Sequence, residues 1–198
     1  FRMMIEDRAG RGPVALQDFR GKVVLVYFGY TYCPDICPTS LAATAEGLKL
    51  LSPEELARVV VIFVSVDPER DSPARLKEYG DFFHPAIVGV TGAADEVAAI
   101  ARRYGVFYAR QPVATAGGGY VVDHTSDTYV VAPDGRLDGK IPHAAPPEQV
   151  AEREMQLDRF RVQPHHVDEC VDRLVWLLVE QEVQSPEIGV GQLPGGLG

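Results

Sequence analysis

The sequence predicts an α/β fold built on a central mixed β-sheet. Two apolar runs without polar alternation, "VVLVYFGY" and "VVVIFVSV", are typical of central strands that are covered on both faces. Segments of helical periodicity lie between the early strands, which favours parallel crossovers. Further along, "DTYVVAPDGRL" combines a strand, a Pro-Asp-Gly turn and a return strand. The last part of the sheet is therefore expected to be an antiparallel hairpin.

Start and stop signals place the helices that flank this sheet. Directly after the first long strand, apolar residues recur every three or four positions, which predicts a helix over residues 39–52. A second helix is expected to follow Ser72, an N-cap residue, with Pro73 at the first helical position. A third helix over residues 93–104 ends at Gly105, a typical C-terminal cap.

Shorter segments complete the order of elements. The stretch "AIVGVTG" predicts a third strand, and "VFYAR" a short one. Residues 111–120, "QPVATAGGGY", are expected to form a flexible glycine-rich loop that is too irregular for a phosphate-binding motif. Residues 1–13 are expected to be an irregular lead-in.

Composition and charge exclude some classes of function. The chain of 198 residues has a formal net charge of −9 and no basic stripe, which argues against nucleic acid as a partner. No segment approaches the roughly 18 apolar residues that a membrane-spanning helix needs. No secretory signal is visible either. Because the sequence starts at Phe1 rather than Met, we expect that a leader or membrane anchor belongs in front of it.

The stretch "YTYCPDICPTS" holds the strongest chemical signal. It places Cys33 and Cys37 four positions apart, at the carboxyl end of the first long strand. Functional sites gather at that end of the strands in open α/β sheets. Only three cysteines are present, too few for a disulfide framework, so the pair indicates redox or metal chemistry. A CxxC pair at this place would indicate a thioredoxin-like protein, and this pair is one residue wider.

The spacing of the two thiols permits two kinds of chemistry. If the helix begins near Pro34, both sulfurs lie on one helix face, with Cα atoms about 6 Å apart and within reach of a disulfide. The positive end of the helix dipole favours the thiolate form. Two thiolates suit either thiol exchange or a soft cation such as Cu(I), zinc or an iron–sulfur centre. A pair of buried structural cysteines is the simpler alternative, which the location at a strand end disfavours.

A metal site needs a further ligand, and His124 is the best candidate among the five histidines. It stands in "VVDHTSDTYVV", directly before the hairpin strand, where a thioredoxin-like sheet brings the chain beside the cysteine helix. A neutral imidazole there would complete an S, S, N site for Cu(I), and Cu(II) could add a water or carboxylate oxygen. A histidine that bonds a neighbouring loop is the alternative.

Acidic residues near this end of the sheet are candidates for supporting roles. Asp67 and Asp71 follow the second strand, where they could offer outer-shell carboxylates, although we favour a structural role for both. Asp35 is expected to favour the helix dipole rather than to bind metal. Asp123 could orient the ring of His124, a task that adjacent residues seldom perform.

Three ordered blocks of sequence resemble the Sco/SenC family of copper-binding proteins. They are "GKVVLVYFGYTYCPDICPTSL", "VSVDPERDSPARLKEY" and "VDHTSDTYVVAPDGR", spread over about residues 12–137. The resemblance implies a thioredoxin-like fold and one copper ion, as Cu(I) or Cu(II), bound by Cys33, Cys37 and His124. It also implies delivery of copper to the binuclear copper centre of cytochrome c oxidase subunit II, or reduction of the cysteines of that subunit.

The same resemblance implies partners and a location. Besides the oxidase subunit, other periplasmic copper chaperones and thiol-disulfide proteins are candidate partners. Family members are usually tethered by one N-terminal transmembrane helix and face the periplasm or the mitochondrial intermembrane space. We therefore expect an extracytoplasmic protein at the periplasmic side of the bacterial inner membrane, with its anchor missing from this sequence.

The C-terminal third extends beyond the resemblance. We predict a thioredoxin-like copper-binding domain over residues 1–145 and a helical extension over residues 146–198 that packs on it and ends in a flexible tail. His166 and Cys170 are four apart on a predicted helix, with His165 adjacent, so a second metal site is conceivable. An apolar stripe on the same helix favours a core role for the cysteine, and two ligands fall short of a closed site.

Other functions on this fold remain as competitors. A metal-free thiol-disulfide oxidoreductase would use Cys33 as nucleophile and Cys37 as resolving thiol, and it would not need His124. A peroxidase of the peroxiredoxin type is disfavoured, because Val26 and Tyr30 stand where that family has a proline and a threonine before Cys33. A structural zinc site usually takes four protein ligands, and only three are identified.

Overall fold

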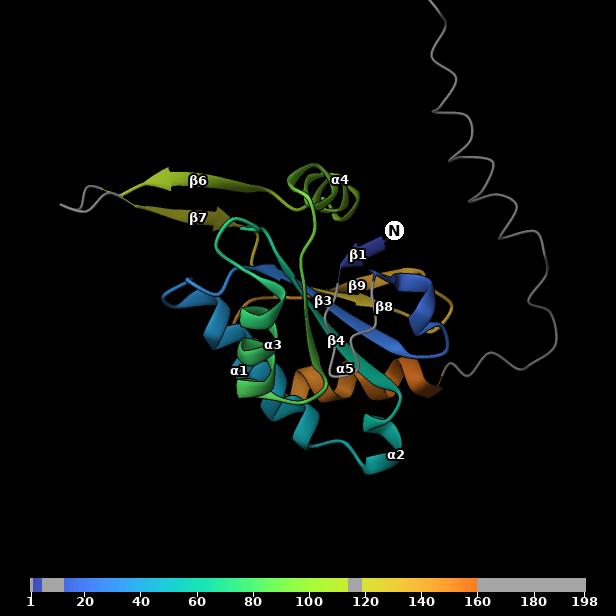
Figure 1. The fold of residues 1–198 in the computed structure, drawn as a ribbon. Coiled ribbons are helices and arrows are strands. Elements are labelled where there is room, and N and C mark those ends of the chain that lie inside the picture. The colour runs from blue at the N-terminus through green and yellow to red at the C-terminus, as the bar shows by residue number, and fades with distance from the viewer. Residues whose placement is uncertain (1, 5–12, 114–118, 160–198) are drawn as a thin grey trace, which may run out of the picture. The chain divides into compact units, whose positions relative to one another are not determined.

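The computed structural model describes residues 2–4, 13–113 and 119–159. Its centre is a five-stranded sheet with the order β5-β4-β3-β8-β9 (Figure 1). The two longest strands lie next to each other, and every residue in them is buried. The five strands are β3 (Val23–Gly29), β4 (Val59–Ser65), β5 (Ile87–Val90), β8 (Thr128–Val131) and β9 (Leu137–Ile141).

Strand direction divides the sheet as the sequence predicts. β3 pairs with β4 in parallel, with Tyr27 opposite Phe63, and β4 pairs with β5 in parallel. On its other edge β3 pairs antiparallel with β8, which turns back into β9. The predicted mixed sheet and its terminal hairpin are therefore confirmed.

Helices cover both faces of the sheet (Figure 1). Because successive strand residues point to opposite faces, Tyr27 and Phe28 mark the two layers. Phe28 packs against Tyr104 of α4, whereas Tyr27 stacks near Phe63, which in turn contacts Tyr79 of α3. The helices are α1 (Ile36–Lys49), α2 (Pro53–Leu56), α3 (Pro73–Phe83), α4 (Ala94–Tyr104) and α5 (Pro147–Arg159), with a 3-10 turn at Leu16–Phe19. Within the described residues, none of these helices has the length and apolarity needed to cross a bilayer.

Two short antiparallel pairs lie outside the main sheet. β1 (Arg2–Met4) pairs with β2 (Pro13–Ala15), so the predicted irregular lead-in contains a strand. β6 (Tyr108–Pro112) pairs with β7 (Tyr120–His124). The prediction of a loop over residues 111–120 is therefore wrong at both ends, because Gln111, Pro112 and Tyr120 belong to strands. Cross-strand pairing on either side overrides the weak strand preference of that stretch.

The predicted C-terminal extension begins with α5, which packs against α1. A Cβ at Gly47 of α1 would come within 2.8 Å of Val150 Cβ, so the two helices approach closely because this glycine has no side chain. Val150, Ala151 and Leu157 are buried in the common core. Residues 160–198, which include His165, His166 and Cys170, lie outside the described part, so the second metal site stays a prediction.

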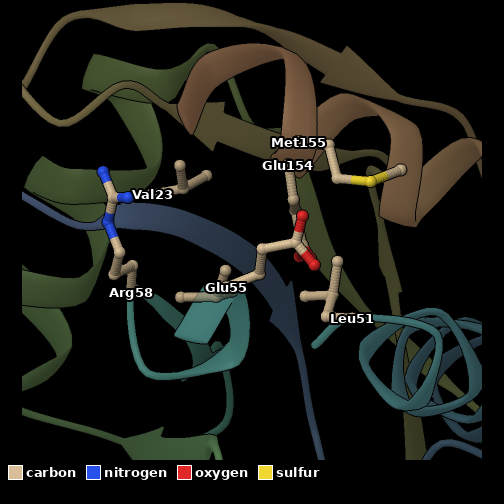
Figure 2. A pocket seen from close by; sticks show the side chains of 7 residues that line it. Val23, Leu51, Glu55, Arg58, Glu154 and Met155 are labelled. Atoms are coloured by element: carbon tan, nitrogen blue, oxygen red, sulfur yellow. The ribbon is translucent and has the colours of Figure 1, made fainter. Parts of the chain in front are cut away.

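Helix α5 also buries an acid. Glu154 is 1% exposed, and neither carboxyl oxygen has a hydrogen-bond partner among the described residues. Figure 2 shows its side chain in a small pocket lined by Val23, Leu51, Glu55 and Met155, among other residues. Burial raises the pKa of Glu154 from 4.5 to about 8. The folded state therefore favours the neutral acid at physiological pH.

We expect Glu154 to make folding stability fall with rising pH. A raised folded-state pKa favours the native state fully below pH 4.5, and this advantage is lost as the pH rises toward 8. The free energy of unfolding should be about 3 kcal/mol lower at pH 7 than below pH 4.5. Glu154→Gln should flatten the dependence of the unfolding free energy on pH, measured by urea denaturation from pH 5 to 8. Glu152→Gln, an exposed position on the same helix, should follow the wild type. Equal pH dependence of the unfolding free energy in Glu154→Gln and the wild type would contradict the raised pKa of Glu154.

Candidate metal centre

The two cysteines lie on either side of the start of α1. β3 ends at Gly29, a turn follows in which Cys33 N donates to Tyr30 O at 3.2 Å, and α1 begins at Ile36. The helix therefore starts three residues before the predicted range of 39–52 and two residues after Pro34, and Cys33 lies before it. Asp35, at the N-cap, makes no side-chain capping bond. Instead, Cys37 N donates to Cys33 Sγ at 3.3 Å, so this sulfur accepts from one of the free N–H groups of the first helical turn.

Gly29 makes room for the second sulfur. A Cβ at this last residue of β3 would lie 2.7 Å from Cys37 Sγ and 2.9 Å from the Phe63 ring, closer than real contacts allow. The absent side chain lets Cys37 settle, fully buried, on the end of the strand. Gly29 is not among the site residues predicted from the sequence. A glycine at the end of an otherwise bulky apolar strand is the signal that could have identified it.

His124 closes the group from the other side. As the last residue of β7, it places Nε2 3.3 Å from Cys37 Sγ, while Nδ1 lies 3.0 Å from the backbone oxygen of Thr125. A carbonyl oxygen only accepts, so Nδ1 carries the ring proton and Nε2 directs its lone pair at the sulfurs. The edges of the His124 ring also contact Tyr27 and Tyr30 in T-shaped geometry.

The three predicted ligands thus meet in one place. Ligand atoms of Cys33, Cys37 and His124 all lie within 4.8 Å of one another. Cys37 is buried, whereas Cys33 and His124 are partly exposed and line an open pocket together with Tyr30 and Ile36. Two soft sulfurs and one imidazole nitrogen form a donor set that suits Cu(I). Solvent access on one side leaves room for a further ligand.

Hydrogen bonding polarises the thiol pair. The side chain of Cys37 hydrogen-bonds the Cys33 thiolate, and this bond holds the pKa of Cys33 at about 3, far below its ordinary value, despite partial burial. The pKa of Cys37 is raised, first by its bond to Cys33 and then by burial. Cys33 is therefore the ionised, accessible sulfur, and Cys37 keeps the proton.

The acidic candidates act as structural anchors. Asp71 is fully buried and accepts from Thr31 N at 3.0 Å, from Thr31 Oγ1 at 2.6 Å and from Ser65 Oγ at 2.7 Å. Its carboxylate therefore fixes the loop before Cys33 to the end of β4. Asp67, equally buried, binds Arg70 and Tyr120. In the described residues, neither joins the group of possible metal ligands.

Two further acidic residues near the site, Asp35 and Asp123, do not belong to the group of possible metal ligands. Asp35 accepts from Thr39 Oγ1 at 3.2 Å. Asp123 is exposed, and the Nδ1 partner of His124 is the Thr125 carbonyl instead. The orienting group therefore comes from the backbone of the residue after the histidine, which composition and spacing do not reveal.

The fold and this site define a class: thioredoxin-like proteins in which a CxxxC pair and a distant histidine share one open pocket. A family model described as SCO1/SenC matches residues 7–157. The chain belongs to the SCO1/SenC family. "Protein SCO2 homolog, mitochondrial" of Bos taurus is 40% identical over 144 residues, which are 72% of this chain and 54% of that protein. The chain thus spans about half the length of the curated relatives it matches.

Solved structures support the same assignment. ScoI of Bradyrhizobium japonicum with copper bound is 34% identical, with a TM-score of 0.70, and the match covers 79% of this chain and 98% of that one. BsSco, described as carrying a disulfide switch and as a member of the Sco family of cytochrome c oxidase assembly proteins, is 25% identical. Its TM-score is 0.60, and the match covers 81% of this chain and 92% of that one. The predicted thioredoxin-like fold is thereby confirmed.

We expect Gly29→Ala to damage the site because the added methyl group must displace Cys37 Sγ or the Phe63 ring. Overpacking of this kind costs about 1–3 kcal/mol of folding stability. Because here it also displaces a ligand sulfur, Cu(I) affinity in a competition assay should fall by about tenfold or more. The matched control is Gly80→Ala in α3, where the new methyl would lie 2.7 Å from Ile87 O, away from the three ligands. It should lower stability but not affinity. Equal losses of affinity in both variants would contradict the role of Gly29 in making room for Cys37 Sγ.

We expect the metal-free, reduced protein to be alkylated at Cys33 at a rate that changes little between pH 8 and pH 6. The lowered pKa keeps this sulfur ionised over that range, whereas an ordinary thiol slows by about tenfold per pH unit. Iodoacetamide labelling followed by peptide mass spectrometry separates the three cysteines. Cys37→Ala, which removes the principal hydrogen bond, should restore a steep pH dependence. A steep dependence of Cys33 alkylation on pH in the wild type would refute the lowered pKa of Cys33.

Proposed function

We propose that the chain binds one copper ion through Cys33 Sγ, Cys37 Sγ and His124 Nε2. The observation that carries this proposal is the meeting of these three ligand atoms within 4.8 Å. The copper-bound ScoI relative supports the choice of metal. As Cu(I), the ion would take the S, S, N set alone, and as Cu(II) it would add a water or carboxylate oxygen through the open side of the pocket.

The next step of the proposal is delivery of this copper to the binuclear copper centre of cytochrome c oxidase subunit II, outside the cytoplasm. BsSco is described as belonging to a family of oxidase assembly proteins, which supports this partner. The partly exposed Cys33 and His124 give incoming thiolates access, while the buried Cys37 is released last. Stepwise exchange of ligands then avoids a free ion.

Reduction of disulfides in the same subunit is a second candidate function, favoured by the unequal pKa values of the two thiols. The Cys33 thiolate would attack a partner disulfide and form a mixed disulfide, releasing one partner thiolate. Cys37, after losing its proton, would attack Cys33 Sγ and release the second partner thiolate. Two electrons would pass to the partner, and this chain would end with a Cys33–Cys37 disulfide.

The experiment that tests the copper proposal is the variant His124→Ala. We expect bound copper per chain, measured after dialysis against a competing chelator, to fall from about one to near zero, because the ion loses one of its three protein ligands and the chelator then competes for it. Reduction of a model disulfide peptide should continue. His84→Ala is the control, since that ring bonds the Ala86 backbone in another loop. Retention of one copper per chain by His124→Ala would refute the ligand assignment, and copper loss accompanied by loss of reduction would leave the two functions inseparable at this residue.

Spectra give a second readout of the same site. Addition of Cu(II) should produce intense sulfur-to-copper charge-transfer bands, since both thiolates would bind the ion directly. The bands should disappear in Cys33→Ser and in Cys37→Ser. Unchanged bands in either variant would contradict the site.

A further inference from the structure

The strand that carries His124 is joined weakly to the rest of the protein. β6 and β7 form their own two-stranded sheet, and in the described residues they share no β-ladder with the five-stranded sheet. Figure 1 shows this ribbon standing apart from the main sheet. An isolated hairpin of two strands is only marginally stable in water. The position of His124 therefore depends on side-chain contacts that tie β7 to the cysteine end of the sheet.

Arg70 supplies several of these contacts from the loop between β4 and α3. Its Nη1 donates to the backbone oxygen of Tyr120 at 3.0 Å, and its guanidinium lies over the Tyr120 ring, 3.7 Å from the centroid. Its Nε pairs with Asp67, which is fully buried. Tyr120 is the first residue of β7, four positions before His124. One side chain thus holds the start of the histidine strand by its backbone and by its ring.

Asp67 closes the arrangement. Its Oδ1 accepts from the Tyr120 hydroxyl at 2.7 Å, while its Oδ2 accepts from Arg70 Nε. The carboxylate therefore bridges the arginine and the tyrosine, so that each of the three side chains touches the other two. Buried charges keep such an arrangement only when they are paired and hydrogen-bonded.

The same guanidinium also reaches the cysteine loop. It lies 5.0 Å from the centroid of the Tyr32 ring, next to Cys33, and 5.5 Å from that of Tyr30. Tyr30 in turn accepts a hydrogen bond from Val122 N in the middle of β7, at 3.2 Å. Arg70 therefore stands between the segment that carries the sulfurs and the strand that carries the imidazole.

We propose that Arg70 is a positioning residue that fixes His124 against the cysteine pair and thereby sets how slowly copper leaves the site. It touches none of the three ligand side chains and acts through Tyr120, Tyr30 and the backbone of β7. This inference rests on the proposed copper function. A residue outside the ligand set would therefore control how long the ion stays bound.

The test compares Arg70→Met, which keeps much of the side-chain length but removes the charge, with the matched control Arg75→Met. Arg75 also lies over the Tyr32 ring, at 4.4 Å, and donates to Thr31 Oγ1 at 2.6 Å, so these contacts lie on the cysteine side of the site. We expect Arg70→Met to speed Cu(II) dissociation into excess chelator by about tenfold or more. Arg75→Met should stay within about twofold of the wild type. Arg70→Lys keeps a charge beside Asp67 but loses the planar stacking on Tyr120. Its rate of copper dissociation should therefore lie between those of the wild type and Arg70→Met.

A metal-free readout separates positioning from a direct effect on the ion. In the copper-free protein, Arg70→Met should speed hydrogen exchange of the Val122 amide, while amides of β3 and β4 exchange as in the wild type. Tyr120→Phe removes only the hydroxyl bond to Asp67 and should give a smaller change in the same direction. This milder variant keeps the test open if Arg70→Met does not fold.

The background variant His124→Ala decides between failure of this inference and failure of the copper proposal. Because His124→Ala is expected to hold almost no copper, the metal-free readout is used in that background. If Arg70 fixes β7, adding Arg70→Met to His124→Ala should still speed hydrogen exchange of the Val122 amide. Wild-type copper dissociation and wild-type Val122 exchange in folded Arg70→Met and Tyr120→Phe proteins would overturn the role of Arg70. The copper proposal would fall separately, if His124→Ala itself kept its copper.

Discussion

The approach of His124 Nε2 to Cys37 Sγ, at 3.3 Å, joins two parts of the fold that share no backbone pairing in the described residues. The sulfur sits on the end of β3, in space that Gly29 leaves free, and the imidazole comes from the separate β6–β7 hairpin. Only together do the two parts supply the S, S, N set of ligand atoms. The metal centre exists only because the hairpin is held against the sheet.

The main sheet and the three residues that meet beside it could be predicted from the sequence. The uninterrupted apolar runs of β3 and β4 leave little choice but buried central strands, and the Pro-Asp-Gly turn marks β8 and β9. Cys33 and Cys37 stand where such sheets place their sites. The meeting of these residues with His124 agrees with the resemblance to a known family, which spacing alone would not have supplied.

Other features depend on contacts that no local pattern encodes. β6 overlaps the short strand predicted at "VFYAR", but β7 and the pairing of the two strands escaped prediction, because the strands are short, half-exposed and joined through a glycine-rich stretch. The contacts of Arg70 link residues 50 positions apart. Each of these features is tertiary in origin.

Asp71 holds the loop before Cys33 in place, which matters when the two cysteines change between thiol, disulfide and metal-bound forms. Its carboxylate takes three hydrogen bonds from Thr31 and Ser65, and none of them involves a sulfur. The loop before Cys33 is therefore braced in the same way whether the cysteines are thiols, a disulfide or ligands of an ion. When the site binds or releases an ion, the cysteine loop therefore stays in place, and the structural change falls mainly on the His124 side.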